Sequence, residues 1–313
     1  MSQLINTIAI VLPVFLVIGL GHLLRRLKLF DAAFVQQTNR LVYVVFLPLL
    51  LFYKIGKADF ASYFNGPLVM ASSLAIVLAF LLTYAYTGLR CYPAPQRGSF
   101  CQGAFRGNLA YVGLAICLNA YGDDGLTRAG ILMGFLVPVL NLFAILALLL
   151  PQQRLADEKG PNWLAQIAFN PLIVASFLGI IWSYWTLPIP LIIDRALGIT
   201  SGLTLPLALL AIGGSFSLQR LKGDLRLAGL SSCVKLILLP LIAAGLMLLF
   251  GVGGTDFGIG ILLAGTPAAT ATYIMADQLK ADAELAGSIV MLSTLASAFS
   301  YTLILLLLGG LSA

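Results

Sequence analysis

Two interruptions in apolar sequence contain residue types that could bind an anion. In the later one, Thr266 followed by Pro267 has the pattern of a helix N-cap and a first helical residue. In the earlier one, Asn108 stands between Gly107 and Gly113, and asparagine caps helices as well as threonine does. A helix that restarts within an apolar segment presents free backbone N–H groups and the positive end of its dipole. Two such helix starts that face one point predict an anion-binding site.

Polar residues beside both interruptions are candidate contacts in such a site. Arg106 and Lys235 each fall ~8 residues inside an apolar segment, which is ~12 Å at 1.5 Å per residue. Cations at this depth usually mark function, but long side chains can also extend to the headgroup layer, and both interpretations stay open. We predict substrate binding by Arg106, Gly107, Asn108, Tyr111, Asn141, Thr266, Pro267, Ala268 and Thr270, with Thr272 as a further polar neighbour and a charge role for Lys235.

The composition places both interruptions in a membrane. Hydrophobic residues make up 60% of the chain and charged residues only 10%, with a mean hydropathy of +1.00. A soluble domain carries about 25% charged residues, so this chain cannot cover itself with a polar surface. The net charge of +6 is spread between apolar segments, which favours membrane orientation over nucleic-acid binding. The four cysteines lack metal-ligand spacing, and no metal site, disulfide framework or cofactor motif is expected.

Ten segments have the ~20 mostly apolar residues that a transmembrane helix needs. Basic residues follow the first segment instead of preceding it, so it is not a signal peptide and its start is expected outside. With that orientation twelve of the eighteen basic residues fall on the cytoplasmic side and four outside, which places both termini outside. The expected spans are residues 4–24, 35–56, 65–88, 99–121, 126–150, 166–186, 195–217, 227–250, 257–279 and 285–308.

The two halves of the chain resemble each other. A shift of 158 residues places Pro48 on Pro206 and Asn108 on Thr266, and four pairs of spans match in the same order. Because each half holds five spans, the second half must cross the membrane in the opposite direction, as in many secondary transporters. We therefore expect an all-α polytopic membrane protein of ten transmembrane helices, built as two inverted repeats whose broken helices 4 and 9 cross. Residues 1–150 form the first repeat, 151–165 a cytoplasmic linker, and 166–313 the second repeat.

Four segments resemble the auxin efflux carrier family, within the bile acid and auxin transporter superfamily. They are Asn39–Phe52, Gly107–Leu114, Thr266–Thr270 with Tyr273, and Leu292–Leu295. The resemblance covers nearly the whole chain without the long central loop of plant members, which implies a bacterial protein of the inner membrane. It also implies an elevator-type transport domain of spans 3–5 and 8–10 on a scaffold of spans 1, 2, 6 and 7, with a homodimer formed through the scaffold. The family often has proline in the fourth-span break, where this chain has Leu109 and Ala115.

The expected function is secondary transport of a small organic anion, a carboxylate, by alternating access in the efflux direction. Its partners would be that anion and the lipid bilayer, and no enzymatic activity is expected. One alternative is a sodium-coupled carrier of the same fold with a bile acid-like substrate, because carbonyls and hydroxyls could still hold sodium. A membrane sensor or enzyme is the other alternative. No Asp or Glu falls in the middle of an expected span, so the sequence offers neither a carboxylate proton relay nor a polar catalytic cluster.

Overall fold

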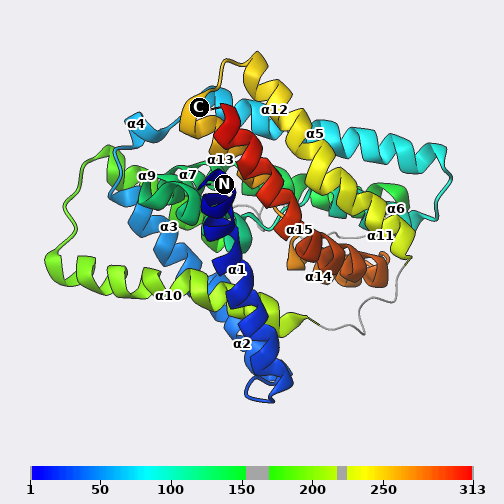
Figure 1. Ribbon diagram of the computed structural model, residues 1–313, viewed down its shortest axis with the longest axis horizontal. Coiled ribbons are helices and arrows are strands. Elements are labelled where there is room, and N and C mark those ends of the chain that lie inside the picture. Colours follow the sequence, from blue (N-terminus) through cyan, green and yellow to red (C-terminus); the bar gives the residue numbers. More distant parts are fainter. Residues whose placement is uncertain (1, 153–168, 217–223, 312–313) are drawn as a thin grey trace.

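The computed structural model describes residues 2–152, 169–216 and 224–311, and every regular element in these ranges is a helix (Figure 1). Most of the expected linker therefore lies outside the described residues. The elements are α1 Ser2–Arg26, α2 Ala32–Leu41, η1 Val42–Phe46, α3 Leu47–Gly56, α4 Phe60–Tyr63, α5 Gly66–Leu89, α6 Ala94–Phe105, η2 Leu109–Gly113, α7 Leu114–Leu149, η3 Leu150–Gln152, α9 Pro171–Tyr184, α10 Leu191–Ser215, α11 Leu225–Cys233, η5 Val234–Leu238, α12 Leu239–Leu249, α13 Gly254–Ala264, α14 Thr270–Gln278 and α15 Ala283–Leu311.

Seven helices within the described ranges are long and apolar enough to cross a membrane. Three of the ten expected spans, the fourth, the sixth and the ninth, are not separate long helices. The expected fourth span is interrupted after α6, and its second part runs on into α7. The sixth is described only as the 14-residue α9, and the ninth is divided into α13 and α14. The count of ten spans therefore stays a prediction.

Polar residues at the ends of the apolar segments determine where several helices begin. The Asp31 carboxylate accepts a hydrogen bond from the Phe34 N–H at 2.6 Å and starts α2. Asn65 and Asn170 accept from the first turns of α5 and α9 in the same way. Asp224 caps α11. Each side chain satisfies an N–H group that has no acceptor within its own helix, so these starts are encoded locally.

The helices pack in two groups (Figure 1). In one group α1 lies along α10, and α3 packs on α9 and α10. A Cβ on Gly21 would lie 2.2 Å from the Leu210 carbonyl oxygen, and one on Gly213 1.9 Å from the Ile18 carbonyl oxygen. Glycine at both positions therefore lets the backbones of α1 and α10 touch, as is common between membrane helices. The other group contains α5, α6, α7 and α11 to α15, joined to the first through α1–α15, α3–α7 and α7–α9 contacts.

The two ends of the described chain lie together (Figure 1). The Gln3 side-chain amide donates to the Leu306 carbonyl oxygen at 3.1 Å, so the start of α1 meets the end of α15. The two helices thus run in opposite directions. Both ends therefore emerge on the same face of the protein.

A non-helical residue divides α7 and gathers charge around it. Gly122 has φ 64° and ψ −155°, a conformation that L-residues with a side chain avoid. At this turn Lys54 pairs with Asp123 at 2.7 Å, and Arg128 pairs with Asp256 at 3.0 Å. These pairs tie α7 to α3 and to α13. The turn thus has the polar character expected where two membrane spans connect.

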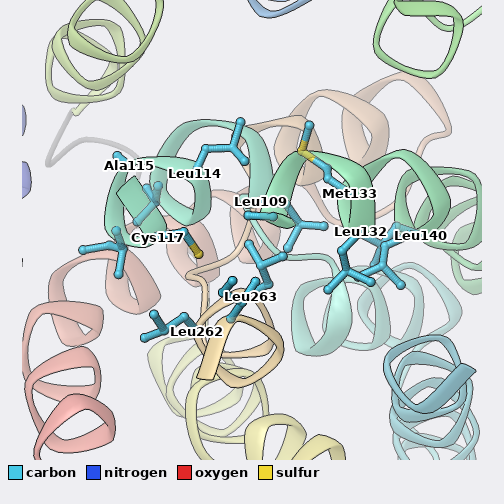
Figure 2. Packing of buried hydrophobic residues seen from close by; sticks show 14 of the residues in the cluster. Leu109, Leu114, Ala115, Cys117, Leu132, Met133, Leu140, Leu262 and Leu263 are labelled. Carbon is cyan, nitrogen blue, oxygen red and sulfur yellow. The ribbon is translucent and has the colours of Figure 1, made fainter. Parts of the chain in front are cut away.

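Part of the buried apolar core surrounds the interruptions in the chain. Figure 2 shows Leu109 and Leu132 close to Leu263 of α13, in a cluster that also contains Leu114 and Leu262. A Cβ on Gly113 would lie 2.8 Å from the Leu263 side chain, so η2 and α13 approach closely here. Apolar packing on both sides therefore holds the polar interruptions in place.

Candidate functional site

The two interruptions pair with each other through their backbones. The Asn108 N–H donates to the Pro267 carbonyl oxygen at 2.8 Å, and the Ala269 N–H donates to the Arg106 carbonyl oxygen at 3.0 Å. Gly107 and Ala268 form an antiparallel bridge between these bonds. Backbone groups that lipid could not satisfy are thereby paired within the protein. The prediction that the broken segments meet is confirmed.

Gly107 is at this position because a side chain would not fit. A Cβ there would lie 2.1 Å from the Thr266 hydroxyl oxygen and 3.3 Å from the Lys235 Nζ atom. Thr266 and Lys235 are both completely buried and cannot move aside without disturbing the core. The close approach of the two chains thus requires glycine.

Asn108 caps the helix that follows the first interruption, as predicted. Its side-chain oxygen accepts from the Tyr111 N–H at 3.3 Å, and η2 starts at Leu109. The Asn108 carbonyl oxygen already accepts from Val112 and Gly113. The N–H groups of Leu109 and Ala110 have no acceptor within the helix, and both residues line a cavity.

The second interruption is built differently, and the prediction that Thr266 is the N-cap and Pro267 the first helical residue is wrong. The Thr266 hydroxyl donates backwards to the Leu263 carbonyl oxygen at 2.8 Å. Helix α14 begins only at Thr270, with Ala269 as its N-cap and no side-chain capping bond. The reason is the bridge: Pro267, Ala268 and Ala269 must stay extended to pair with residues 106–108, so the helix restarts three residues later.

Both helix starts open onto one cavity of about 1110 Å³. Leu109 and Ala110 line it from η2, and Thr270 and Ala271 from α14. The charged residues in the lining are Arg25, Arg40, Arg106 and Glu284. Three cations against one carboxylate leave an excess of two positive charges, to which two helix dipoles add their positive ends. This arrangement suits an anion.

Arg106 is the cation nearest to the crossing in sequence. Its Nη2 atom donates to the Asn141 side-chain oxygen at 2.9 Å, which holds the guanidinium against α7. The Nη1 atom is buried and has no partner among the described residues. A guanidinium offers five N–H donors, so Arg106 retains donors for a ligand after it has bonded Asn141.

Tyr111 connects the crossing to the other group of helices. Its hydroxyl donates to the Asn39 carbonyl oxygen at 3.3 Å, at the end of α2. The Asn39 amide in turn donates to the Ser215 hydroxyl oxygen at 3.3 Å. Tyr111 therefore lies between the two groups of helices as well as in the cavity wall.

The cavity brings together most of the predicted site residues. Those in its lining are Arg106, Gly107, Asn108, Tyr111, Asn141 and Thr270. Thr266, Pro267 and Ala268 are outside the lining, because they form the back of the crossing, and Thr272 is fully buried. The sequence prediction missed Arg25, Asn39, Arg40, Tyr43 and Glu284, which also line the cavity. The segment Asn39–Phe52, which resembles the auxin efflux carrier family, contains Asn39, Arg40 and Tyr43. That resemblance was the signal in the sequence from which these three residues could have been found.

Lys235 lies on the opposite side of the crossing. Its side chain is 0% exposed, and its Nζ atom donates to the Ala264 carbonyl oxygen at 2.5 Å. The interpretation in which it reaches the headgroup layer is therefore wrong. Lys235 does not line the large cavity but a small one of about 20 Å³, together with Ser72 and Gly107.

The described residues contain no group of three His, Cys, Asp or Glu side chains that could hold a metal ion. The four cysteines are free thiols. The polar groups that line the large cavity are amides, hydroxyls, guanidinium groups, the Glu284 carboxylate and the two helix starts. The excess of positive charge in this lining is compatible with an anion.

Apolar helices that break at a shared crossing, with a polar cavity beside it, define a membrane carrier. Comparison with known families agrees: the chain belongs to the family described as membrane transport protein, which matches residues 7–305. The resemblance to the auxin efflux carriers is confirmed by this match and by a plant relative. The protein is accordingly a membrane transporter and not an enzyme.

Two of the relatives span most of the chain, and a third matches less than half of it. An "Uncharacterized transporter" of Methanothermobacter thermautotrophicus is 26% identical over 94% of this chain and 95% of its own. A "Putative malonate transporter" of Rhizobium meliloti is 25% identical over 96% of this chain and 95% of its own. "Auxin efflux carrier component 6" of Arabidopsis thaliana is 27% identical over 46% of this chain and 26% of its own.

Proposed function

We propose that the protein is a secondary transporter of small organic anions, with carboxylates as its substrates. The observation that carries this proposal is the pair of helix starts, after Asn108 and at Thr270, that open onto one cavity with excess positive charge. Backbone N–H groups at a helix start bind carboxylates without the need for a side-chain cation. The name of the Rhizobium relative, which refers to malonate, supports a carboxylate substrate.

In this proposal the first interruption selects the substrate. Arg106 donates to a carboxylate from the side of its guanidinium that Asn141 leaves free. Asn108 holds the helix start open, and Tyr111 and Thr270 line the volume around the ligand. Charge-assisted hydrogen bonds of this kind are about twice as strong as neutral ones, so the anion is distinguished from its neutral acid.

Transport would move one group of helices against the other. The proposed scaffold is α1, α2, α3, α9 and α10, and the proposed transport domain is α5, α6, α7 and α11 to α15. The packing of α1 along α10 and of α3 on α9 supports the first group as one unit, which could pair with a second copy through its lipid-facing side. Ten spans in two inverted repeats fit the two interruptions, which would reverse direction across the midplane.

The proposed orientation places both termini in the periplasm of a bacterial inner membrane. The cavity extends from the crossing to Arg25, Arg40 and Glu284, and the distribution of basic residues puts that side in the cytoplasm. The cavity then opens inward, as expected for a carrier that loads its substrate inside and exports it. A cysteine placed at position 313, in a variant without native cysteines, should react with an impermeant maleimide in intact cells. Labelling only after lysis would overturn this orientation.

The test of function is counterflow of radiolabelled malonate in proteoliposomes, with unlabelled mono- and dicarboxylates as competitors. Arg106→Gln should weaken binding by ~1–3 kcal/mol, the scale of a hydrogen bond to a charged group. Arg195→Gln is the matched control, because Arg195 is exposed on α10 and does not line the cavity. The proposal fails if the purified carrier shows no counterflow with any carboxylate. A requirement for a sodium gradient with a bile acid substrate would favour the alternative carrier instead.

A further inference from the structure

Among the described residues, the buried Lys235 side chain has no carboxylate partner. Its hydrogen-bond acceptor is the Ala264 carbonyl oxygen, at 2.5 Å. The described residues around it in the small cavity are apolar except for Ser72, and none of them is acidic. An unpaired charge buried in a membrane protein is costly, so a stabilising field must come from elsewhere.

The C-terminus of α13 provides that field. A helix end leaves four carbonyl groups without partners in the helix and carries the negative end of the dipole. Here the Ile261 carbonyl accepts from the Gly265 N–H, and the Leu263 carbonyl accepts from Thr266. The Leu262 carbonyl accepts from the Tyr301 hydroxyl at 3.3 Å, which leaves the Ala264 carbonyl for Lys235.

Lys235 also contacts the crossing itself. A Cβ on Gly107 would lie 3.3 Å from both the Cε and the Nζ atoms of Lys235, so the ammonium lies directly behind the bridge. The adjoining cavity of about 20 Å³ has room for one water molecule, and the Ser72 hydroxyl that lines it has no partner among the described residues. The site is therefore shaped for a small cation with one or two neutral oxygen neighbours.

We propose that Lys235 is a built-in counterion at the break of α13, and that it takes the position which a free alkali cation would otherwise have to occupy. The carrier then needs no sodium to keep the second interruption open. The structural part of this inference is independent of transport, whereas its consequence, sodium-independent anion transport, rests on the proposed function.

The structural part is tested by thermal unfolding of the detergent-purified protein in choline, sodium or ethylammonium chloride. Wild-type protein should unfold at the same temperature in all three salts. Lys235→Ala removes the charge and enlarges the cavity, so it should unfold earlier in choline and regain stability in ethylammonium. Lys235→Met is the matched control: it removes the charge but fills the space, so no salt should restore it. Wild-type stability of Lys235→Met in choline would overturn the proposal.

The transport part uses the same variants in proteoliposomes, with malonate counterflow normalised to folded carrier. Wild-type transport should be equal in sodium and choline, and Lys235→Ala should lose about tenfold in choline and recover in ethylammonium. Wild-type transport that requires sodium would overturn the proposal even if neither variant folds. If the wild type transports no carboxylate in either salt, the proposed function fails, and the unfolding temperatures still decide the role of Lys235.

Discussion

The two interruptions solve one physical problem with different groups. At the first, between α6 and η2, a side chain caps the new helix: Asn108 accepts from the Tyr111 N–H. At the second, between α13 and α14, no side chain caps the start of α14. The side chains of Thr266 and Lys235 instead donate hydrogen bonds to the carbonyl groups at the end of α13. The first break is thus stabilised at a helix start and the second at a helix end.

The two breaks also differ in whether their polar side chains line the large cavity or are buried in the core. The polar groups of the first break, Arg106 and Asn108, line the large cavity. Those of the second, Thr266 and Lys235, are completely buried behind the bridge. A ligand in the cavity would meet side chains of the first break and mainly the backbone start of α14 from the second. Substitutions of these polar side chains should therefore change affinity at the first break and stability at the second.

The largest expected effect comes from the bridge that joins both breaks. Gly107→Ala would place a Cβ 2.1 Å from the Thr266 hydroxyl oxygen, so we expect the bridge to separate. The cost should reach ~3 kcal/mol, the upper end of overpacking in a dense core. In Gly265→Ala the nearest atom, at 2.7 Å, is the flexible Cδ1 end of Ile304, and the cost should stay below ~1 kcal/mol. Unfolding temperatures of the two purified variants check this, and equal values would contradict the packing argument.

The second largest effect is expected for Pro267→Ala, which should reduce transport. Proline costs ~3 kcal/mol in a helix interior, so its removal favours a continuous helix through the second break at the expense of the bridge. We expect this variant to fold and reach the membrane but to lose most malonate counterflow per folded carrier. Pro206→Ala, inside the continuous α10, is the control and should retain transport. Full transport by Pro267→Ala would show that the bridge, and not proline, holds the break open.

The smallest expected effect is a difference in malonate affinity between variants of Asn108 and Thr266, the two residues that align in the repeat. Asn108→Ala removes a helix cap in the cavity wall and should cost ~0.5–2 kcal/mol in malonate affinity. Thr266→Ala removes a hydroxyl that faces away from the cavity, so the affinity should stay within about twofold. Competition counterflow measures both affinities. An equal loss at the two positions would restore Thr266 to the binding site.

Local sequence predicted much of this molecule. The apolar segments place most of the helices, and Asn108 starts a helix as predicted. Asn65 and Asn170, which were not predicted as caps, start helices by the same local bonds. A meeting of the two interruptions was predicted from their alignment along the chain, but the pairing of Gly107 with Ala268 was not. These features depend on neighbours within one helical turn or on periodic hydrophobicity, and the sequence contains both kinds of information.

Only the tertiary structure decided where the second helix restarts and which residues share the cavity. The start of α14 at Thr270 follows from hydrogen bonds to Arg106 and Asn108, more than 150 residues away in the chain. Arg25 and Arg40 suggested only orientation in the sequence, yet packing of α1 and α2 places them in the lining of the same cavity as Arg106. The acceptor of Lys235 likewise lies on another helix. Long-range pairing of this kind depends on which backbone groups each break leaves unsatisfied, and that is fixed only when the helices pack.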